Sequence, residues 1–258
     1  MQRHHRLLFP IAGVLLALGA VGTAASAATL LTYTLASGSV AASGVASNVA
    51  ASSLTSGNTV LIGASSTYQN LFYLLQQTSG GTTYALPTSQ ASALSSGDAE
   101  SFTLTFSSAT TLSNLAFDIG GNVGAGATSF DANVFAVIAI GGTSYTEAAT
   151  ITQGGVGGSV YSVTAANSNY SSLAGTGVID LSSLPAGLTG PITVSLYAYE
   201  TNLAGTLASG TNNAIRLSEI SVSAVPEPSS TAFLVVSGAG LAALYCLRAA
   251  RFPAGLVR

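Results

Sequence analysis

The sequence predicts an all-β protein whose body is an antiparallel β-sandwich or a jelly-roll-like fold. Apolar and polar residues alternate with a period of two along much of the chain, which is the pattern of half-buried strands. Glycine, serine and asparagine separate these runs, as is typical of turns. Charged residues make up only 6% of the chain, so hydroxyl and amide side chains provide most of its polar surface.

The first 27 residues have the pattern of a secretory signal peptide. Arg3 and Arg6 form a basic start, an apolar run extends from Leu7 to Thr23, and Ala25 and Ala27 supply the small residues of a cleavage site. The alternative is a first transmembrane helix, but this run leads through small residues into the cleavage site. We therefore expect cleavage after Ala27 and export by the Sec machinery.

Residues 28–224 form the predicted β body. Phe102, Leu104 and Phe106 alternate with serine and threonine, whereas the run from Val134 to Ile140 is apolar on both faces and predicts a central strand. The pattern predicts strands at 30–35, 59–62, 82–86, 101–106, 115–119, 134–140, 143–151, 159–165, 178–181 and 192–198, and a closing strand at 215–225.

Three local features of the body carry specific predictions. Gly141 and Gly142 separate two strands and predict a two-residue hairpin, because glycine tolerates positive φ angles. The glycine clusters at 120–126 and 154–158 are interpreted as turns, since no lysine and helix follow them as in a phosphate-binding loop. Residues 68–77 are predicted as a short helix.

The closing strand predicts a β-bulge. Its apolar residues Ile215 and Leu217 occupy odd positions, whereas the apolar residues of Ile220 to Ala224 occupy even ones. A regular strand would place these two sets on opposite faces. One extra residue at Ser218 and Glu219 would bring both sets to the same face.

The three-part tail of residues 225–258 begins with a Pro-Glu-Pro motif at 226–228. Residues 231–247 then form an uncharged stretch, long enough as a helix to cross roughly 25 Å of the bilayer. Arginines follow it directly, and positive charge on that flank places it in the cytoplasm and the body outside. The alternative is a buried helix of the body, which would normally have a polar face.

This tail, together with the signal peptide, resembles the PEP-CTERM sorting signal of proteins exported by Gram-negative bacteria. The resemblance implies that Pro226, Glu227 and Pro228 are recognised by a membrane-embedded exosortase. It also implies that the helix, with Arg248 and Arg251, is discarded after processing. The protein would then be anchored transiently in the inner membrane before it reaches the cell surface or the medium, in bacteria that make exopolysaccharide matrices. The physical alternative is that the prolines form a stiff linker.

The composition of the body excludes several functions. Between residues 28 and 225 there is no histidine, lysine, cysteine or tryptophan, and Arg216 is the only basic residue. A nucleic-acid partner is excluded because phosphate binding needs clustered basic residues. Catalysis through a histidine base, a cysteine nucleophile or a histidine- or cysteine-bound zinc is excluded as well. We therefore predict a body that is not an enzyme.

The carboxylates of the body are the remaining candidates for a chemical site. Asp98 with Glu100, and Asp118 with Asn122, could supply oxygen ligands to Ca²⁺. Neither pair resembles the dense acidic loop of an EF-hand, and the alternative is that they are solvated carboxylates in loops and at strand ends. No other cofactor is expected.

Two functions remain open. The first is a non-enzymatic surface or extracellular-matrix protein, linked to exopolysaccharide in a biofilm. The second is a carbohydrate-binding, lectin-like module in which exposed tyrosines such as Tyr197 and Tyr199 offer amphipathic rings to sugars. A lectin-like module should have an aromatic and acidic groove with measurable glycan affinity, which a matrix protein does not need.

Overall fold

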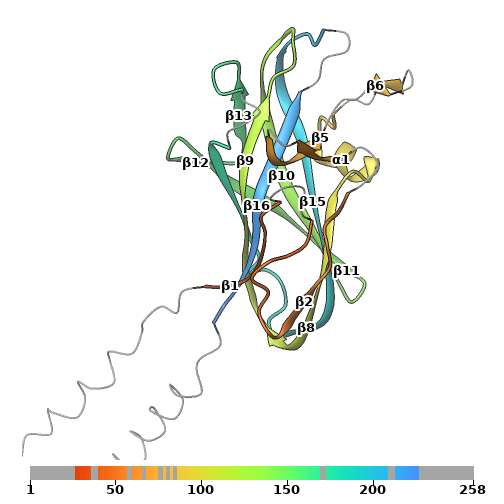
Figure 1. Cartoon of the computed structure of the whole chain (residues 1–258), viewed down its shortest axis with the longest axis vertical. Coiled ribbons are helices and arrows are strands. Elements are labelled where there is room, and N and C mark those ends of the chain that lie inside the picture. Colours follow the sequence, from red (N-terminus) through yellow and green to blue (C-terminus); the bar gives the residue numbers. More distant parts are fainter. Residues whose placement is uncertain are drawn as a thin grey trace, which may run out of the picture.

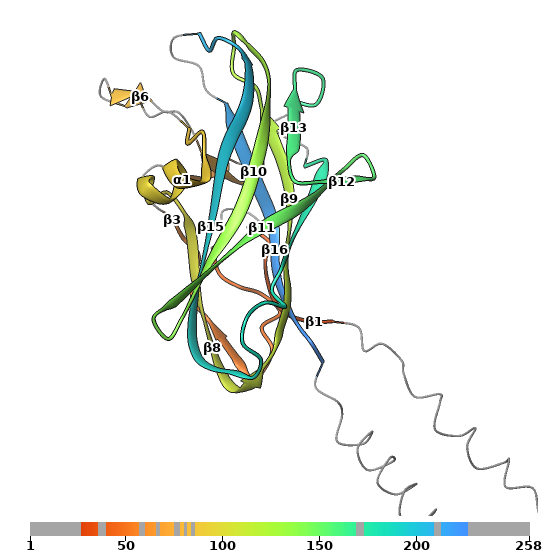
Figure 2. The same cartoon turned by 180° about the vertical axis from the view of Figure 1, so that it is seen from behind.

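The computed structural model describes residues 27–35, 40–56, 60–65, 68–74, 78–79, 82–83, 86–168, 173–208 and 213–226. These residues are predominantly β, and the strands pair antiparallel, which confirms the prediction of an all-β, antiparallel body. Figures 1 and 2 show an elongated body in which long strands run from one end to the other.

The described strands fall into one large sheet and two small hairpins. The 12-stranded sheet contains β1 (Ala28–Tyr33), β2 (Val49–Ala51), β3 (Thr55–Ser56), β8 (Glu100–Thr110), β9 (Leu112–Asn122), β10 (Ala127–Ile140), β11 (Thr143–Gln153), β12 (Val156–Gly158), β13 (Tyr161–Thr164), β14 (Gly175–Asp180), β15 (Leu188–Gly205) and β16 (Ala214–Ala224). Outside it lie β4 (Val60–Ser65) with β5 (Tyr68–Leu74), β6 (Thr78–Ser79) with β7 (Thr82–Thr83), and the helix α1 (Gln90–Ser96).

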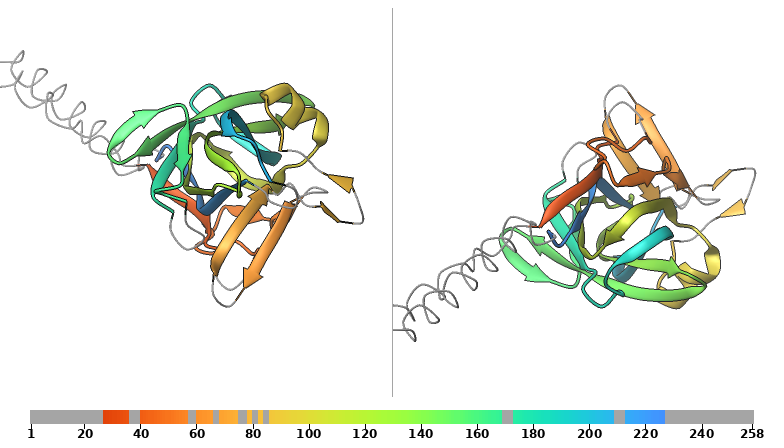
Figure 3. Two further views of the ribbon diagram at one scale, coloured as in Figure 1. Left: turned by 90° about the horizontal axis from the view of Figure 1, so that it is seen from above. Right: turned by 90° about the horizontal axis from the view of Figure 1, so that it is seen from below.

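The large sheet nearly closes on itself. Its strand order is β1-β16-β9-β14-β11-β10-β15-β8-β2. Strand β11 connects the two sides of the sheet, because its first half pairs with β10 and its second half pairs with β14. On the other side, Ser43 forms a β-bridge with Thr32, and the backbone of Ala46 donates to Leu30 at 2.8 Å. This segment leads into β2 and closes most of the gap between the sheet edges. Figure 3 shows the resulting ring of strands, with β4 and β5 in orange outside it.

The inward faces of the strands form one hydrophobic core. Phe102, Leu104 and Phe106 are at most 3% exposed, as their alternation with polar residues predicts. Every second residue of β15 from Ile192 to Ala198 is buried in the same way. Burial of one large apolar side chain is worth about 1.5–3 kcal/mol. The core and the strand pairing therefore stabilise the described body, which contains no cysteine for a disulfide.

The predicted hairpin is confirmed. Ile140 and Thr143 are partners across a two-residue turn in which Gly141 and Gly142 have φ angles of 55° and 88°. Two positive φ angles are characteristic of the type I′ turn, whose twist matches that of the flanking strands. The glycines at 154 and 155 form an equivalent turn between β11 and β12, with φ angles of 58° and 81°.

The predicted bulge in the closing strand is also confirmed. Ser218 pairs with Asp118 and Ser221 pairs with Ala116, so two residues of β16 lie opposite one residue of β9. The extra residue brings the apolar residues before and after it to the same face of the strand, and all of them are at most 5% exposed. Glu219, within the bulge, is exposed and has a φ angle of 48°.

We expect that replacing Glu219 with glycine stabilises the protein by about 1 kcal/mol. A left-handed backbone costs a residue with a Cβ about 1–2 kcal/mol, and glycine avoids this cost but loses more entropy on folding. Urea unfolding of the purified exported protein would measure the gain. Glu219→Ala is the matched control, because alanine removes the same carboxylate and keeps the backbone cost. An equal gain in both variants would contradict the backbone explanation.

Two local predictions were wrong. Residues 68–74 form strand β5 and not a helix. The helix α1 lies later in the chain, where Ser89 caps its start through a capping box with Ser92 and Gly97 ends it with a φ angle of 70°. In the first glycine cluster, Gly120 and Gly121 belong to β9, and only the later residues form a turn.

Several predicted segments lie outside the described residues. These are the signal peptide up to residue 26, with Ala25, the transmembrane helix at 231–247, and Glu227, Pro228, Arg248 and Arg251. Within the part of the chain that the structure does describe, no helix is long and apolar enough to cross a membrane.

Candidate functional site

The two ends of the body lie side by side. Ala28, which follows the predicted signal cleavage site, is the partner of Ala224 in the pairing of β1 with β16. Beyond Ala224, the backbone of Val225 donates to Thr111 at 2.8 Å and so extends the pairing of β16 with β9 by one residue. The start of β1 and the end of β16 lie close together (Figure 1). Ala27 and Pro226, the described residues of the two predicted processing regions, thus leave the body at neighbouring positions.

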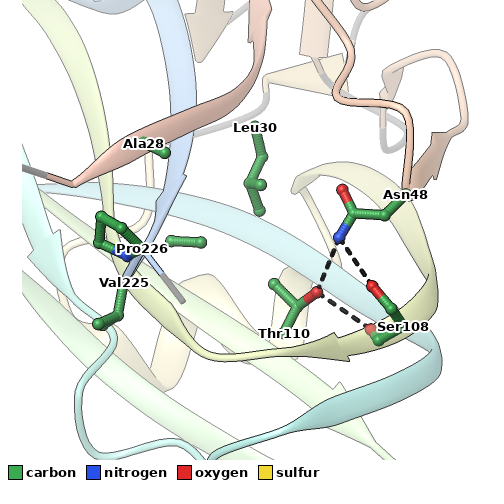
Figure 4. A pocket seen from close by; sticks show the side chains of 8 residues that line it. Ala28, Leu30, Asn48, Ser108, Thr110, Val225 and Pro226 are labelled. Atoms are coloured by element: carbon green, nitrogen blue, oxygen red, sulfur yellow. Dashed lines mark hydrogen bonds between the residues drawn. The ribbon is translucent and has the colours of Figure 1, made fainter. Parts of the chain in front are cut away.

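A pocket of about 320 Å³ lies at this end of the body. One part of its lining is polar, since Asn48 Nδ2 donates to Ser108 Oγ at 3.2 Å and to Thr110 Oγ1 at 3.1 Å (Figure 4). The other part is apolar and comes from the two chain ends. The lining residues are Ala28, Leu30, Asn48, Ser108, Thr110, Ala224, Val225 and Pro226. The pocket contains no charged side chain and no group suited to acid–base catalysis.

The predicted Ca²⁺ ligands Asp98 and Glu100 are buried, so the interpretation of these residues as solvated carboxylates was wrong. Asp98 is 8% exposed and Glu100 only 2%. Glu100 begins β8 and shares the inward face of Phe102 and Leu104. Neither oxygen of its carboxyl group has a hydrogen-bond partner among the described residues. Burial raises the pKa of Glu100 to about 8, because the charged form has lost its hydration.

Asp118 lies apart from these two residues. It is part of β9, where its register partners are Thr176 of β14 and Ser218 of β16, and partial burial raises the pKa of its carboxyl group. Asn122, its suggested companion, accepts a hydrogen bond from Ser168 Oγ at 2.8 Å. In the described ranges, no three histidine, cysteine or acidic side chains are grouped so that they could hold a metal ion.

A buried polar network joins the turns at the opposite end of the body. Glu200 is 5% exposed, and its Oε2 accepts a hydrogen bond of 2.7 Å from Nδ2 of Asn213, which is fully buried. Oδ1 of Asn213 in turn accepts from the backbone of Gly124 at 2.9 Å. Burial raises the pKa of Glu200, and the hydrogen bond from Asn213 partly offsets that increase. The network links β15, the start of β16 and the turn after β9.

An aromatic group lies on the outer face of β10 and β15. Phe135 and Tyr197 are register partners, and their rings stack with centroids 5.1 Å apart at an angle of 11°. Tyr199 meets Phe135 edge-on, with centroids 6.1 Å apart. Phe135 is only 2% exposed, whereas both tyrosines are partly exposed. The two predicted tyrosines therefore share one face, above a phenylalanine that the sequence analysis did not select.

Polar side chains continue this outer face toward the start of β10. Asp131 accepts hydrogen bonds from Asn202 Nδ2 at 2.7 Å and from the hydroxyl of Ser162. Asn133 Nδ2 donates to Thr201 Oγ1 at 3.0 Å. The sequence analysis did not select Asp131 as a residue of this surface. Its neighbour Ala132 is buried, so Asp131 faces outward.

The exposed charge of the described body is entirely negative. Arg216, the only basic residue of the described body, is 0% exposed. Its neighbours Ile215 and Leu217 face the core, so the Arg216 side chain points to the opposite face of β16, where β5 packs. Three carboxylates are buried as well. The others, which are partly or fully exposed, are Asp118, Asp131, Glu147, Asp180 and Glu219. Such a surface repels anionic polymers unless divalent cations bridge them.

Searches with this chain against protein-family models, curated proteins and solved structures found no match.

Proposed function

We propose that this chain is a non-enzymatic exported protein of the cell surface or extracellular matrix, sorted by an exosortase through residues 225–258. The observation that carries the proposal is the pairing of Ala28 with Ala224. The body starts directly after the proposed signal cleavage site and ends directly before the Pro-Glu-Pro motif. Because both ends leave it together, the body could fold completely while membrane segments hold it by one end, and cleavage there would not cut into the core.

The proposed absence of catalysis is supported by the positions of the carboxylates. Glu100 and Glu200 face the core, where Glu200 is held by Asn213. The pocket beside the chain ends is lined by small apolar residues, hydroxyls and one amide. We further propose that the two halves of the nearly closed sheet face each other across the core in the manner of a β-sandwich. Association with exopolysaccharide would then take place on the outer faces of the strands.

We expect the finished protein to begin at Ala28 and to end near Pro226. Signal peptidase would cut after Ala27, and the exosortase would cut near the Pro-Glu-Pro motif, where two prolines keep the chain extended and available to a protease. Intact-mass measurement of the protein from the cell surface and the medium would test this. A strain without the exosortase is the control and should accumulate the form that retains residues 231–258.

Two results would contradict the proposal. A finished surface protein that retains residues 231–258 would indicate a simple membrane anchor. Release of reducing sugars from a polysaccharide panel by the purified protein, abolished by Asp118→Asn or Glu147→Gln, would indicate an enzyme.

A carbohydrate-binding module is the second candidate, and one observation favours it. Tyr197 and Tyr199 lie next to each other on the outer face of β15, and Phe135 contacts both rings. Tyrosines held in this way could contact the apolar faces of sugars while their hydroxyl groups remain in water.

A further inference from the structure

We propose that the outer face of β10 and β15 binds a chain of uncharged sugars. The β10–β15 strip, as we name this surface, consists of Asp131, Asn133, Tyr197, Tyr199 and Thr201, with Phe135 beneath the rings. The inference rests on the carbohydrate-binding candidate above and adds to it a defined surface and a class of ligand.

The strip combines the two kinds of contact that a sugar offers. The tyrosine rings present apolar surface that suits the C–H faces of a sugar ring. Next to them, Asn133 is in register with Tyr199, and Asp131 is in register with Thr201. Amide, hydroxyl and carboxylate groups can form hydrogen bonds with sugar hydroxyls as donors or acceptors. Outward side chains recur every second residue, about 7 Å apart along a strand, so the strip suits an extended ligand.

The side chains of the strip are held in place before any ligand arrives. Phe135 stacks on Tyr197 and meets the edge of Tyr199. Asn133 is fixed by Thr201 Oγ1, and Asp131 is fixed by Asn202 at 2.7 Å. Ordering a mobile side chain lowers affinity, so a surface that is already ordered binds more tightly. Buried Phe135 is therefore a positioning residue, and the partly exposed tyrosines would contact the ligand.

The charge of this face selects among polysaccharides. Asp131 is the only charged residue of the strip, and the single arginine of the described body is buried on β16. An anionic polysaccharide would be repelled by this negative surface, which has no exposed cation among the described residues, whereas a neutral polysaccharide would not be repelled. Because no three histidine, cysteine or acidic side chains of the described residues are grouped so that they could hold a metal ion, we expect binding through the strip not to require Ca²⁺.

The test is affinity electrophoresis of the purified exported protein through gels that contain soluble neutral glucan, mannan or galactan, with EDTA present. Alginate and hyaluronate serve as anionic comparisons. We expect at least one neutral polysaccharide to retard the protein and the anionic ones to leave its mobility unchanged. The double variant Tyr197→Ser/Tyr199→Ser should weaken binding by roughly tenfold or more, since each lost aromatic contact lowers the affinity severalfold.

Two further variants separate binding from stability. Val178→Ser changes a residue that is 42% exposed on β14, which pairs with β9 and β11 and with neither strand of the strip, and should bind as the unaltered protein does. Tyr197→Phe/Tyr199→Phe keeps the rings and should retain most of the affinity. Circular dichroism and thermal unfolding would show that each variant is folded at the temperature of the assay.

The outcomes also separate this inference from the proposed function. Absence of binding to every neutral polysaccharide, or binding that the serine variant leaves unchanged, would overturn the inference. Binding only to anionic polysaccharides in the presence of Ca²⁺ would overturn it too, and would favour bridged association with the matrix. Self-association that the serine variant abolishes, without glycan binding, would assign the strip to contacts between copies of this chain. None of these results would affect the processing of the two ends, which intact mass measures separately.

Discussion

Replacing Asn213 with alanine is expected to destabilise the protein by about 3 kcal/mol at neutral pH. Asn213 donates to Glu200 at 2.7 Å and accepts from Gly124 at 2.9 Å, and all three groups lie at the same end of the body. The change leaves a buried carboxyl group and a backbone N–H without these partners, at about 1–3 kcal/mol for each unsatisfied group. Urea unfolding of the purified exported protein would measure the loss.

The matched control for this variant is Asn48→Ala. Asn48 also donates two hydrogen bonds, but it is partly exposed and water can replace its amide. We expect the control to cost less than about 1 kcal/mol. Because Asn213 lowers the pKa of Glu200, the Asn213→Ala cost should grow as the pH rises, and Glu200→Gln should recover part of it. Equal losses of stability in the two alanine variants would show that the buried hydrogen bonds of Asn213 stabilise the protein no more than the partly exposed ones of Asn48.

Much of the fold could be predicted because strand patterns and tight turns are local. The parity of apolar residues placed the strands, and two adjacent glycines placed the turn between β10 and β11. Even the bulge followed from the change of parity between Leu217 and Ile220. In each case, one face of a strand had to be buried, so a short stretch of sequence determined the register.

The closure of the sheet could not be predicted in the same way. It depends on bridges such as Ser43 with Thr32, and on the pairing of the three-residue β2 with β8, more than 50 positions further along the chain. A strand of three residues is too short to show a clear period-two pattern, so it cannot be identified from the sequence. The helix α1 had a readable signal, a serine cap and a terminal glycine, but the aromatic run that became β5 was chosen instead.

The burial of Glu100 and Glu200 was not predicted, although each lies an even number of positions from the buried apolar residues of its strand. Glu100 has the parity of Phe102, Leu104 and Phe106, and Glu200 has that of Ile192 to Ala198. Carboxylates are rarely buried without a partner, which favoured their interpretation as solvated groups in loops and at strand ends. The hydrogen bond between Glu200 and Asn213 could not be foreseen, because it depends on how two strands meet at the end of the body.

Glu100→Gln is expected to remove a large pH dependence of stability. In the unfolded chain this carboxyl group ionises near its ordinary pKa of 4.5, whereas in the folded protein it keeps its proton up to about pH 8. The folded state therefore binds one more proton than the unfolded state between these two values, and stability falls as the pH rises through this range. The difference between these two pKa values corresponds to about 5 kcal/mol, of which about 4 kcal/mol is lost by pH 8.

The glutamine variant should differ little from the unaltered protein below about pH 4.5 and exceed it in stability by about 4 kcal/mol near pH 8. Urea unfolding at several pH values would give the difference in unfolding free energy at each. That difference cancels the contribution of Glu200, which both proteins retain. Ser101→Ala, at the next position on the opposite face of β8, changes no titratable group and should differ from the unaltered protein by a constant amount. A constant difference for Glu100→Gln as well would mean that its carboxyl group titrates alike in the folded and unfolded states, and hence that water reaches it in the folded protein.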